Sequence, residues 1–297
     1  MVKVAVAGGT GGLGRYIVEA ILATGKHEVV ILSRSAKAPI SGAEVIAIDY
    51  TDPTSLDHAL VGVHTVIVCL FDHDPASFIA SQTALLDAAV RSGAKRFAPS
   101  EFIIRSLAND PIAIYAPKGV VAEAVKKSGL EYTFFENGVF LNYLGTGTPG
   151  LGYMRPLHFI VNLEEWSAKL PEDGKAKIVF THGEDVGAFV AASLELQKWP
   201  EVSQMAGDVK SYKEIVELLE TITGKKLDVT YIPIADTKSQ LVPNPPSVFT
   251  NFLGQILIEI VESGRFHFSD PNLNKLCPEV KPIKVEEFLQ KWWGKNE

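Results

Sequence analysis

The stretch Gly8-Gly9-Thr10-Gly11-Gly12-Leu13-Gly14 follows an apolar run, residues 2–7, and leads into an amphipathic run, residues 15–22. This order predicts a strand, a tight glycine turn and a helix. Either Gly8 or Gly9 can begin a glycine pattern that Gly11 and Gly14 complete. In both spacings one glycine permits the turn, the next lets a diphosphate approach the backbone, and the last lets the helix pack on its strand. The stretch therefore predicts a dinucleotide site at a helix N-terminus, with an ordinary tight turn as the alternative.

The composition limits the class of protein. The chain has 297 residues, of which 46% are hydrophobic, so it can bury one large core or two lobes that share a cleft. The formal net charge of −7, with no run rich in lysine or arginine, argues against nucleic acid as a partner. Cys69 and Cys277 have no metal-ligand spacing and suggest no disulfide framework. We expect no metal site.

Two further patterns concern location. The first apolar run starts almost at Met1, so we expect no signal peptide. The most apolar late stretch, residues 252–261, is too short to span a bilayer. We therefore expect a cytoplasmic protein without a membrane contact, present as a monomer or a homodimer.

Strand and helix patterns alternate along the first half of the chain, which predicts a doubly wound parallel α/β sheet with right-handed crossovers. The predicted strands after the first are residues 28–32, 44–48, 64–70, 95–98 and 131–135, and the predicted helices between them are residues 53–61, 75–92 and 117–127.

The regular alternation ends past Asn137. Residues 145–156 are rich in glycine and proline and are expected to leave the sheet as a loop. We assign residues 1–144 to the dinucleotide-binding domain, to which residues 177–198 return. Residues 145–176 and 199–297 are expected to form a smaller α+β substrate lobe over the carboxyl ends of the strands, where ligands bind in such folds. The later predicted elements are strands 177–180 and 227–232 and helices 184–196, 211–223, 247–263 and 285–293.

The position about twenty residues after the glycine turn indicates the cofactor. An acidic residue there would accept bonds from a ribose 2′-hydroxyl and select NAD. This chain has Arg34 instead, flanked by serines that include Ser35, with Lys37 nearby. Their positive charges favour a 2′-phosphate and hence NADP(H), although solvated loop charges would leave the choice open. Asp49, after the third strand, is either a contact to the adenine amino group or a plain turn residue.

Lys118 is the candidate for proton transfer. It follows Pro117 and so lies in the first turn of a helix, where a cation has the unfavourable sign. A partly buried lysine there tends to have a lowered pKa, whereas an exposed lysine would have no such role. No Tyr-x-x-x-Lys pair exists, because Tyr115 precedes Lys118 by three residues. The chain also lacks G-x-S-x-G and H-E-x-x-H motifs.

These features resemble a known family. The glycine turn, Arg34, the run Lys95-Arg96-Phe97-Ala98-Pro99-Ser100-Glu101-Phe102 and Lys118 are similar to the atypical short-chain reductases of the NmrA-like branch, which contains isoflavone and phenylcoumaran benzylic ether reductases. The resemblance implies an NADPH-binding Rossmann domain and a small substrate lobe. It also implies that Lys118 contacts the nicotinamide ribose and handles the proton, and that Asn137 lines the nicotinamide pocket. The chain departs from the family at Ile103, where glycine is frequent.

We therefore predict an NADPH-dependent reductase that passes a hydride to a small aromatic or conjugated substrate, with Lys118 as proton donor or relay. A non-catalytic NADP(H)-binding redox sensor is the alternative, and an isomerase that retains its cofactor is disfavoured by the missing tyrosine. The predicted substrate residues are Phe102, Phe140, Tyr143 and His158. The predicted cofactor-binding residues are Gly8, Thr10, Gly11, Gly12, Leu13, Gly14, Arg34, Ser35, Lys37, Asp49, Leu70, Phe71, Pro99, Ser100, Glu101, Lys118 and Asn137.

Overall fold

The computed structural model describes residues 1–158 and 160–294. Six strands form one parallel sheet in the order β3-β2-β1-β4-β5-β6. This order confirms the doubly wound sheet that the alternating pattern predicts. The strands are β1 (Lys3–Ala7), β2 (Glu28–Ser33), β3 (Glu44–Ala47), β4 (Thr65–Val68), β5 (Arg96–Ala98) and β6 (Glu131–Tyr132).

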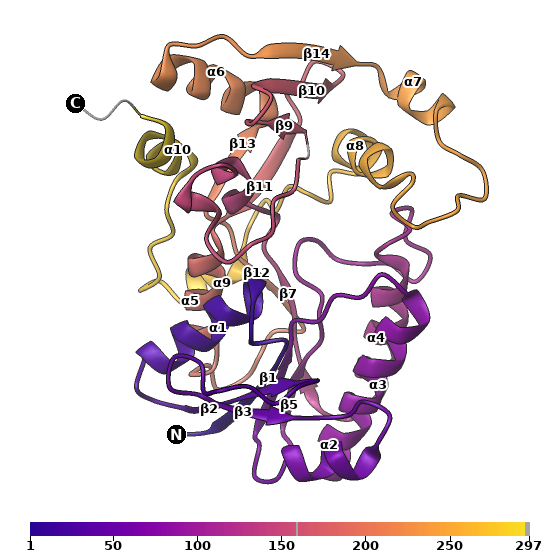
Figure 1. Cartoon of the computed structure of the whole chain (residues 1–297), viewed down its shortest axis with the longest axis vertical. Coiled ribbons are helices and arrows are strands. Elements are labelled where there is room, and N and C mark those ends of the chain that lie inside the picture. Colours follow the sequence, from indigo (N-terminus) through magenta and orange to yellow (C-terminus); the bar gives the residue numbers. More distant parts are fainter. Residues whose placement is uncertain (159, 295–297) are drawn as a thin grey trace.

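Helices cover both faces of this sheet (Figure 1). Alternate residues of β1 point to opposite faces, so Val4 and Val6 pack with α1 and α5. Ala5 and Ala7 pack with the three helices of the other face, α2, α3 and α4. Helix α5, although late in the chain, thus covers the same face as α1. The bounds are α1 (Gly12–Ala23), α2 (Pro53–Ala59), α3 (Pro75–Arg91), α4 (Ala116–Lys127) and α5 (Gly183–Ser193).

Most of the remaining elements form a second lobe above the sheet (Figure 1). Its core is a separate hydrophobic cluster, and Ser211 and Glu214 form a capping box at the start of α6. Three small sheets have the orders β14-β10-β9, β13-β11-β8 and β12-β7. Their strands are β7 (Phe134–Glu136), β8 (Val139–Phe140), β9 (Val161–Asn162), β10 (Ser167–Pro171), β11 (Lys177–Thr181), β12 (Val202–Gln204), β13 (Asp208–Ser211) and β14 (Asp228–Ile232). The helices are α6 (Tyr212–Thr223), α7 (Ile234–Ser239), α8 (Phe252–Glu262), α9 (Asn272–Leu276) and α10 (Val285–Trp293).

The C-terminal helix packs against the glycine-rich segment that leaves the sheet. This segment contains two short 3-10 helices, η1 (Leu141–Gly145) and η2 (Pro149–Leu151). The Trp293 indole donates a hydrogen bond to the carbonyl of Leu144 (2.7 Å). The Trp292 ring lies so close to Gly150 that a Cβ there would come within 2.7 Å of it. Helix α10 therefore fixes the position of this segment.

The predicted strand 131–135 is divided in the structure. Residues before Thr133 pair with β5, whereas β7 pairs with β12. The Thr133 hydroxyl donates to the Ser203 hydroxyl (2.7 Å), and the Phe134 N–H donates to the carbonyl of Glu201 (2.9 Å). After Thr133 the chain therefore pairs with β12 instead of β5. For this reason β6, the last strand of the six-stranded sheet, is shorter than predicted.

The predicted helix 247–263 begins later than expected, at Phe252 in α8. The side chain of Asn251 bonds both the N–H and the carbonyl of Val242, each at 2.9 Å. These bonds hold residues 242–251 as a closed loop.

Candidate functional site

The glycines of the first turn have different physical roles. Gly8 has φ of 81°, and a Cβ on it would lie 2.4 Å from the carbonyl oxygen of Cys69. A Cβ on Gly14 would lie 2.4 Å from the carbonyl oxygen of Gly8, so Gly14 permits the close approach of α1 to its strand. Gly11 is extended, and a Cβ there would meet nothing within 4 Å. This arrangement favours the spacing Gly8, Gly11, Gly14.

The space in front of Gly11 suits an anion. No side chain caps α1 at Gly11, and the first turn of the helix contains no acidic residue. Its N–H groups and helix dipole therefore face open space, as a diphosphate requires. No packing within the described residues demands a glycine at position 11, and its role in the approach of a diphosphate stays a prediction.

The predicted 2′-phosphate residues lie beside this turn. Arg34, Ser35 and Lys37 are exposed, and Lys37 Nζ donates to the Thr10 hydroxyl at 3.3 Å. Within the described ranges neither Arg34 nor Lys37 forms an ion pair, although the Arg34 charge contributes to the lowered pKa of the Asp72 carboxyl. The Asp49 carboxylate accepts bonds from the Thr51 N–H and hydroxyl (2.8 and 2.7 Å), which lower its pKa. Its contact with adenine stays a prediction.

Lys118 lies in the first turn of α4, next to Pro117 as predicted. Its Nζ donates to the carbonyl of Glu101 in a short hydrogen bond and to the carbonyl of Phe102 at 3.3 Å. Burial lowers the Lys118 pKa, whereas the charges of Glu101 and Asp110 act to raise it. The lowered pKa of Lys118 agrees with the sequence prediction, and its main cause is burial.

The residues after β5 form the turn that receives this lysine. The Ser100 hydroxyl donates to the carbonyl of Leu70 (2.6 Å), which joins the ends of β4 and β5. Phe102 and Ile103 follow with φ of 33° and 89°. Asn137, which is fully buried, accepts a bond from the Ile103 N–H through Oδ1 at 2.9 Å. The structure therefore brings Ser100, Lys118 and Asn137 to one turn.

The predicted substrate residues differ in how deeply they are buried and in which residues they contact. Phe102 is 5% exposed, and its ring stacks on Phe135 at 5.8 Å, so it belongs mainly to the core. Phe140 is also buried, with its ring 6.1 Å from that of half-buried Tyr143, and burial raises the Tyr143 pKa to about 12. His158 is exposed and lies 3.3 Å from Glu164. No contact among the described residues joins His158 to Lys118, and its role in substrate binding stays a prediction.

A row of aromatic rings crosses between the lobes. Phe71, which is 60% exposed, has its ring 5.2 Å from His73 and 6.2 Å from Phe249. The rings of His73 and Phe249 lie 5.1 Å apart, and further ring contacts of 6.3 and 6.5 Å extend the row. The last ring lies 4.9 Å from Lys118 Nζ. This aromatic row consists of Phe71, His73, Phe249, Phe252 and Tyr115.

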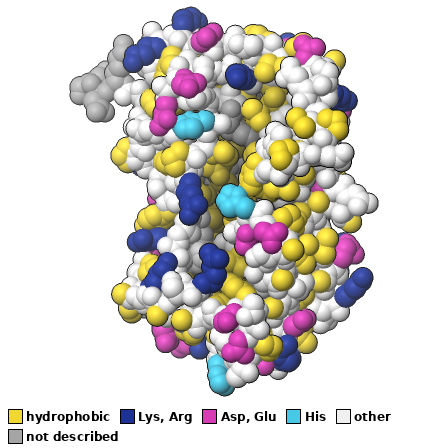
Figure 2. All heavy atoms as spheres, turned by 45° about the vertical axis from the view of Figure 1, so that its right-hand side comes forward, with side chains coloured by type: hydrophobic (Ala, Val, Ile, Leu, Met, Phe, Trp, Pro, Cys, Tyr) yellow, Lys and Arg dark blue, Asp and Glu magenta, His cyan; other side chains and the backbone are white. Residues whose placement is uncertain are grey.

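Sequence reasoning missed Phe249 and Phe252, because no motif or spacing connects them with Phe71. The fold supplies the connection by placing residues 249–252 of the second lobe over the loop after β4. Figure 2 shows the groove between the lobes, with hydrophobic side chains in it, lysine or arginine side chains along one rim and a histidine on the other.

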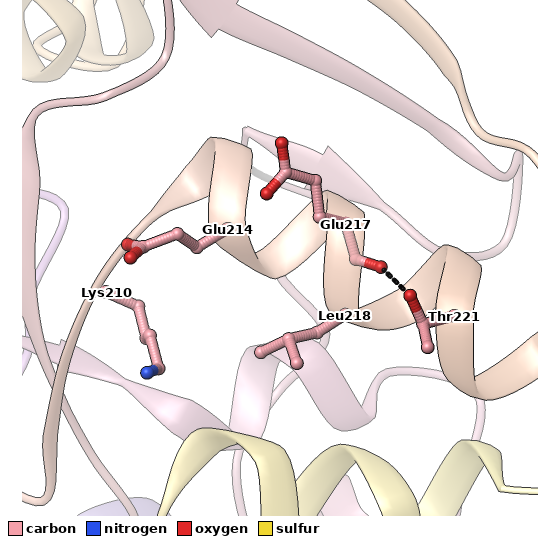
Figure 3. Close-up of a pocket in the computed structure, with 5 residues that line it drawn as sticks. All are labelled: Lys210, Glu214, Glu217, Leu218 and Thr221. Atoms are coloured by element: carbon pink, nitrogen blue, oxygen red, sulfur yellow. Dashed lines mark hydrogen bonds between the residues drawn. The ribbon is translucent and has the colours of Figure 1, made fainter.

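A shallow hollow of about 220 Å³ lies elsewhere, on the outer side of α6 (Figure 3). Within it the Thr221 hydroxyl donates to the carbonyl of Glu217, an ordinary helical contact (2.8 Å). The hollow lies at the opposite end of the molecule from β1 (Figure 1) and has no link to the glycine turn. Its lining residues are Lys210, Glu214, Glu217, Leu218 and Thr221.

Residues 1–158 and 160–294 contain no helix with the length and apolar character needed to cross a bilayer. In the same ranges no group of three or more histidine, cysteine, aspartate or glutamate side chains is arranged to hold a metal ion.

The chain is similar to known oxidoreductases over most of its length. A sequence model of the NmrA-like family matches residues 2–289. Oxidoreductase BOA1 of Botryotinia fuckeliana (strain B05.10) is 38% identical over 238 residues, covering 76% of this chain and 77% of that protein. Phenylcoumaran benzylic ether reductase IRL1 of Ginkgo biloba is 27% identical over 321 residues, covering 98% of each. The solved structure of AtPrR2 with NADP+ and (+)pinoresinol has a TM-score of 0.76 at 24% identity, covers 98% of both chains and shows the shared fold.

Proposed function

The chain belongs to the NmrA-like family, and we propose that it is an NADPH-dependent reductase of a small aromatic or conjugated substrate, with Lys118 as the proton donor or relay. Two of its relatives are named an oxidoreductase and a reductase, and they support reductase chemistry as the activity. One observation carries the proposal for this chain. The half-buried ammonium of Lys118 lies where the ends of β4 and β5 meet, at the end of the aromatic row.

NADP(H) is the cofactor that the surrounding residues fit. The open space at Gly11 and the uncapped start of α1 suit its diphosphate. Arg34 and Lys37 supply positive charge for the 2′-phosphate, and Lys37 already reaches the glycine turn. We assign this binding to residues 1–144, with α5 packed behind α1.

NADPH, held by the glycine turn with Arg34 and Lys37, would supply the hydride. Addition of that hydride to an unsaturated carbon leaves negative charge on the neighbouring substrate atom. The ammonium of Lys118, directly or through a water, gives this atom a proton and recovers one from solvent. Burial lowers the Lys118 pKa and makes the ammonium a stronger acid, while Glu101 and Asp110 favour its charged form before the reaction.

The aromatic row supports a planar, conjugated substrate. Exposed aromatic rings stack on other aromatic rings, each contact contributing about 0.5–1.5 kcal/mol beyond burial. Phe71 is largely exposed, and Phe249 completes the ring contact from the second lobe. A flat substrate that stacks at the Tyr115 end of the row would lie beside Lys118, whose Nζ is 4.9 Å from the Tyr115 ring.

The experiment is a screen of NADPH oxidation with quinones, enones, imines and aryl ethers as acceptors. Turnover of one class by the unmutated protein, lost in Lys118→Met, is the expected result. Calorimetric titration with NADPH accompanies the screen. Tight NADPH binding without oxidation of any acceptor would instead favour the redox sensor, and absence of NADPH binding would contradict both functions.

A further inference from the structure

The backbone that binds Lys118 has an unusual conformation for its residues. Phe102 and Ile103 both have positive φ, 33° and 89°. A β-branched residue is especially unfavourable there, because its Cβ substituents clash with the adjacent backbone. Such a conformation persists only when neighbouring groups hold it in place.

Residues 137 and 138 supply those neighbouring groups. Asn137 Oδ1 accepts a bond from the Ile103 N–H (2.9 Å). The N–H groups of Asn137 and Gly138 both donate to the Ile103 carbonyl, at 3.1 and 2.7 Å. Both polar groups of the Ile103 backbone are therefore bound by this pair of residues.

The pair is itself fixed. Asn137 Nδ2 donates to the carbonyl of Gly138 (3.0 Å), and the carbonyl of Asn137 accepts a bond from the Thr181 hydroxyl (2.7 Å). Gly138 lies against β11, where a Cβ would come within 2.2 Å of the Val179 carbonyl oxygen. Ile103 is thus held by two residues that are themselves anchored to β11.

This geometry bears directly on the lysine. The two carbonyls that accept from Lys118 Nζ belong to Glu101 and Phe102, the residues immediately before Ile103. Their directions depend on the dihedral angles of this turn. We propose that Asn137 is a positioning residue for Lys118, because it holds Ile103 in the left-handed conformation and thereby aims the carbonyls of residues 101 and 102 at the ammonium. Only the expected effect on rate depends on the proposed function.

Asn137→Ala tests this role, with Asn142→Ala as the matched control. Asn142 is also fully buried and accepts a bond from the Gly183 N–H at 2.7 Å, but it donates to Tyr16 and has no contact with the turn. The readout is the pH titration of the Lys118 Cε and Nζ resonances in lysine-labelled protein, assigned by their loss in Lys118→Met. Melting temperatures show how much each variant is destabilised.

We expect the pKa of Lys118 to fall in Asn137→Ala and to stay unchanged in Asn142→Ala. The carbonyls favour the charged form of the lysine, and the burial that disfavours it would remain. Equal titration curves in both variants would overturn the proposal. A rise in the pKa would also overturn it, since the turn would then keep the lysine buried rather than bonded.

A second variant, Ile103→Gly, tests whether Asn137 acts through the turn. Glycine adopts a φ of 89° without steric cost. In Ile103→Gly the conformation of the turn should therefore depend less on the hydrogen bonds from residues 137 and 138. Asn137→Ala should therefore shift the Lys118 titration less when it is combined with Ile103→Gly than when it is introduced alone. Equal shifts in the two cases would show that Asn137 does not act through the turn.

Measuring the rate of hydride transfer distinguishes this inference from the proposed function. With an acceptor that the unmutated protein reduces, Asn137→Ala should slow hydride transfer by about 10- to 100-fold, the scale of a misplaced catalytic group. A shifted titration with an unchanged rate would confirm the positioning role and refute Lys118 as the proton donor.

Discussion

Two turns border the candidate site. Both contain residues with left-handed backbone angles, but the residue types differ. The first uses Gly8 and Gly12, at φ of 81° and 51°. The second uses Phe102 and Ile103, at 33° and 89°. Glycine accepts these angles readily, whereas other residues there cost on the order of 1–3 kcal/mol each. The first turn is therefore stable through its own residues, and the second depends on bonds from elsewhere in the chain.

The largest expected effect comes from breaking the first turn. Gly8→Val places a branched residue at φ of 81° with its Cβ against the carbonyl of Cys69. We expect a loss of about 4 kcal/mol or more in the free energy of unfolding, or no folded protein. Chemical denaturation followed by circular dichroism measures it.

Gly11→Val is the matched control within the same turn. Gly11 is extended and faces open space, so the free energy of unfolding should change by about 0.5 kcal/mol or less. NADPH and NADH should lose affinity together, as calorimetry would show. Retained affinity for both would mean that this turn serves packing alone.

The second turn is tested through the lysine that it binds. Lys118→Met keeps most of the side-chain volume but removes the proton donor, so hydride transfer should slow by ~10²–10⁴. Single-turnover kinetics with an accepted substrate measures the rate. A variant that reacts at nearly the original rate would refute the catalytic role of Lys118.

A buried acid behind the second turn gives a smaller, pH-dependent effect. Burial raises the pKa of Glu136, next to Asn137, to about 7. Between its ordinary pKa near 4.5 and 7 the folded protein holds a proton that the unfolded chain releases, so the free energy of unfolding falls as pH rises. Glu136→Gln should remove this slope and raise stability at pH 8 by up to ~3 kcal/mol.

Denaturation curves at pH 5, 6, 7 and 8 would measure the slope in both proteins. Glu201→Gln is a suitable control, because this glutamate is exposed on the same segment as β12. An identical slope in the unmutated protein and in Glu136→Gln would show that Glu136 is already ionised when folded.

Cofactor selectivity gives the smallest expected change. Arg34→Asp replaces a charge that favours the 2′-phosphate with one that repels it and can accept a bond from a 2′-hydroxyl. We expect the unmutated protein to prefer NADPH about tenfold to thousandfold, and the variant to prefer NADH. Equal dissociation constants for the two cofactors in the unmutated protein would contradict the assignment of Arg34.

The two turns also show how far the sequence could predict the site. The glycine turn, the parallel sheet and Lys118 at the start of α4 follow from local patterns, and the structure places all three as expected. The second turn could not be predicted from local patterns, because Phe102 and Ile103 carry no turn signature and are held by residues 137 and 138 of another segment.

The need for long-range contacts also explains the other differences between the predicted and the observed structure. Phe249 meets Phe71 only through the packing of two lobes. Strand β6 ends early because a distant strand competes for the backbone of Phe134. Long-range contacts decided each of these features, and no window of local sequence contains them.

The packing of α10 on the segment after β8 places two intrinsic fluorophores beside that segment. The indoles of Trp292 and Trp293 contact Gly150 and Leu144, on the stretch where the chain leaves the main sheet. Indole emission changes with the polarity and rigidity of its surroundings. The chain also contains Trp166 and Trp199. A change in fluorescence that is lost in Trp292→Phe or Trp293→Phe would therefore report that this stretch shifts when a ligand enters the groove.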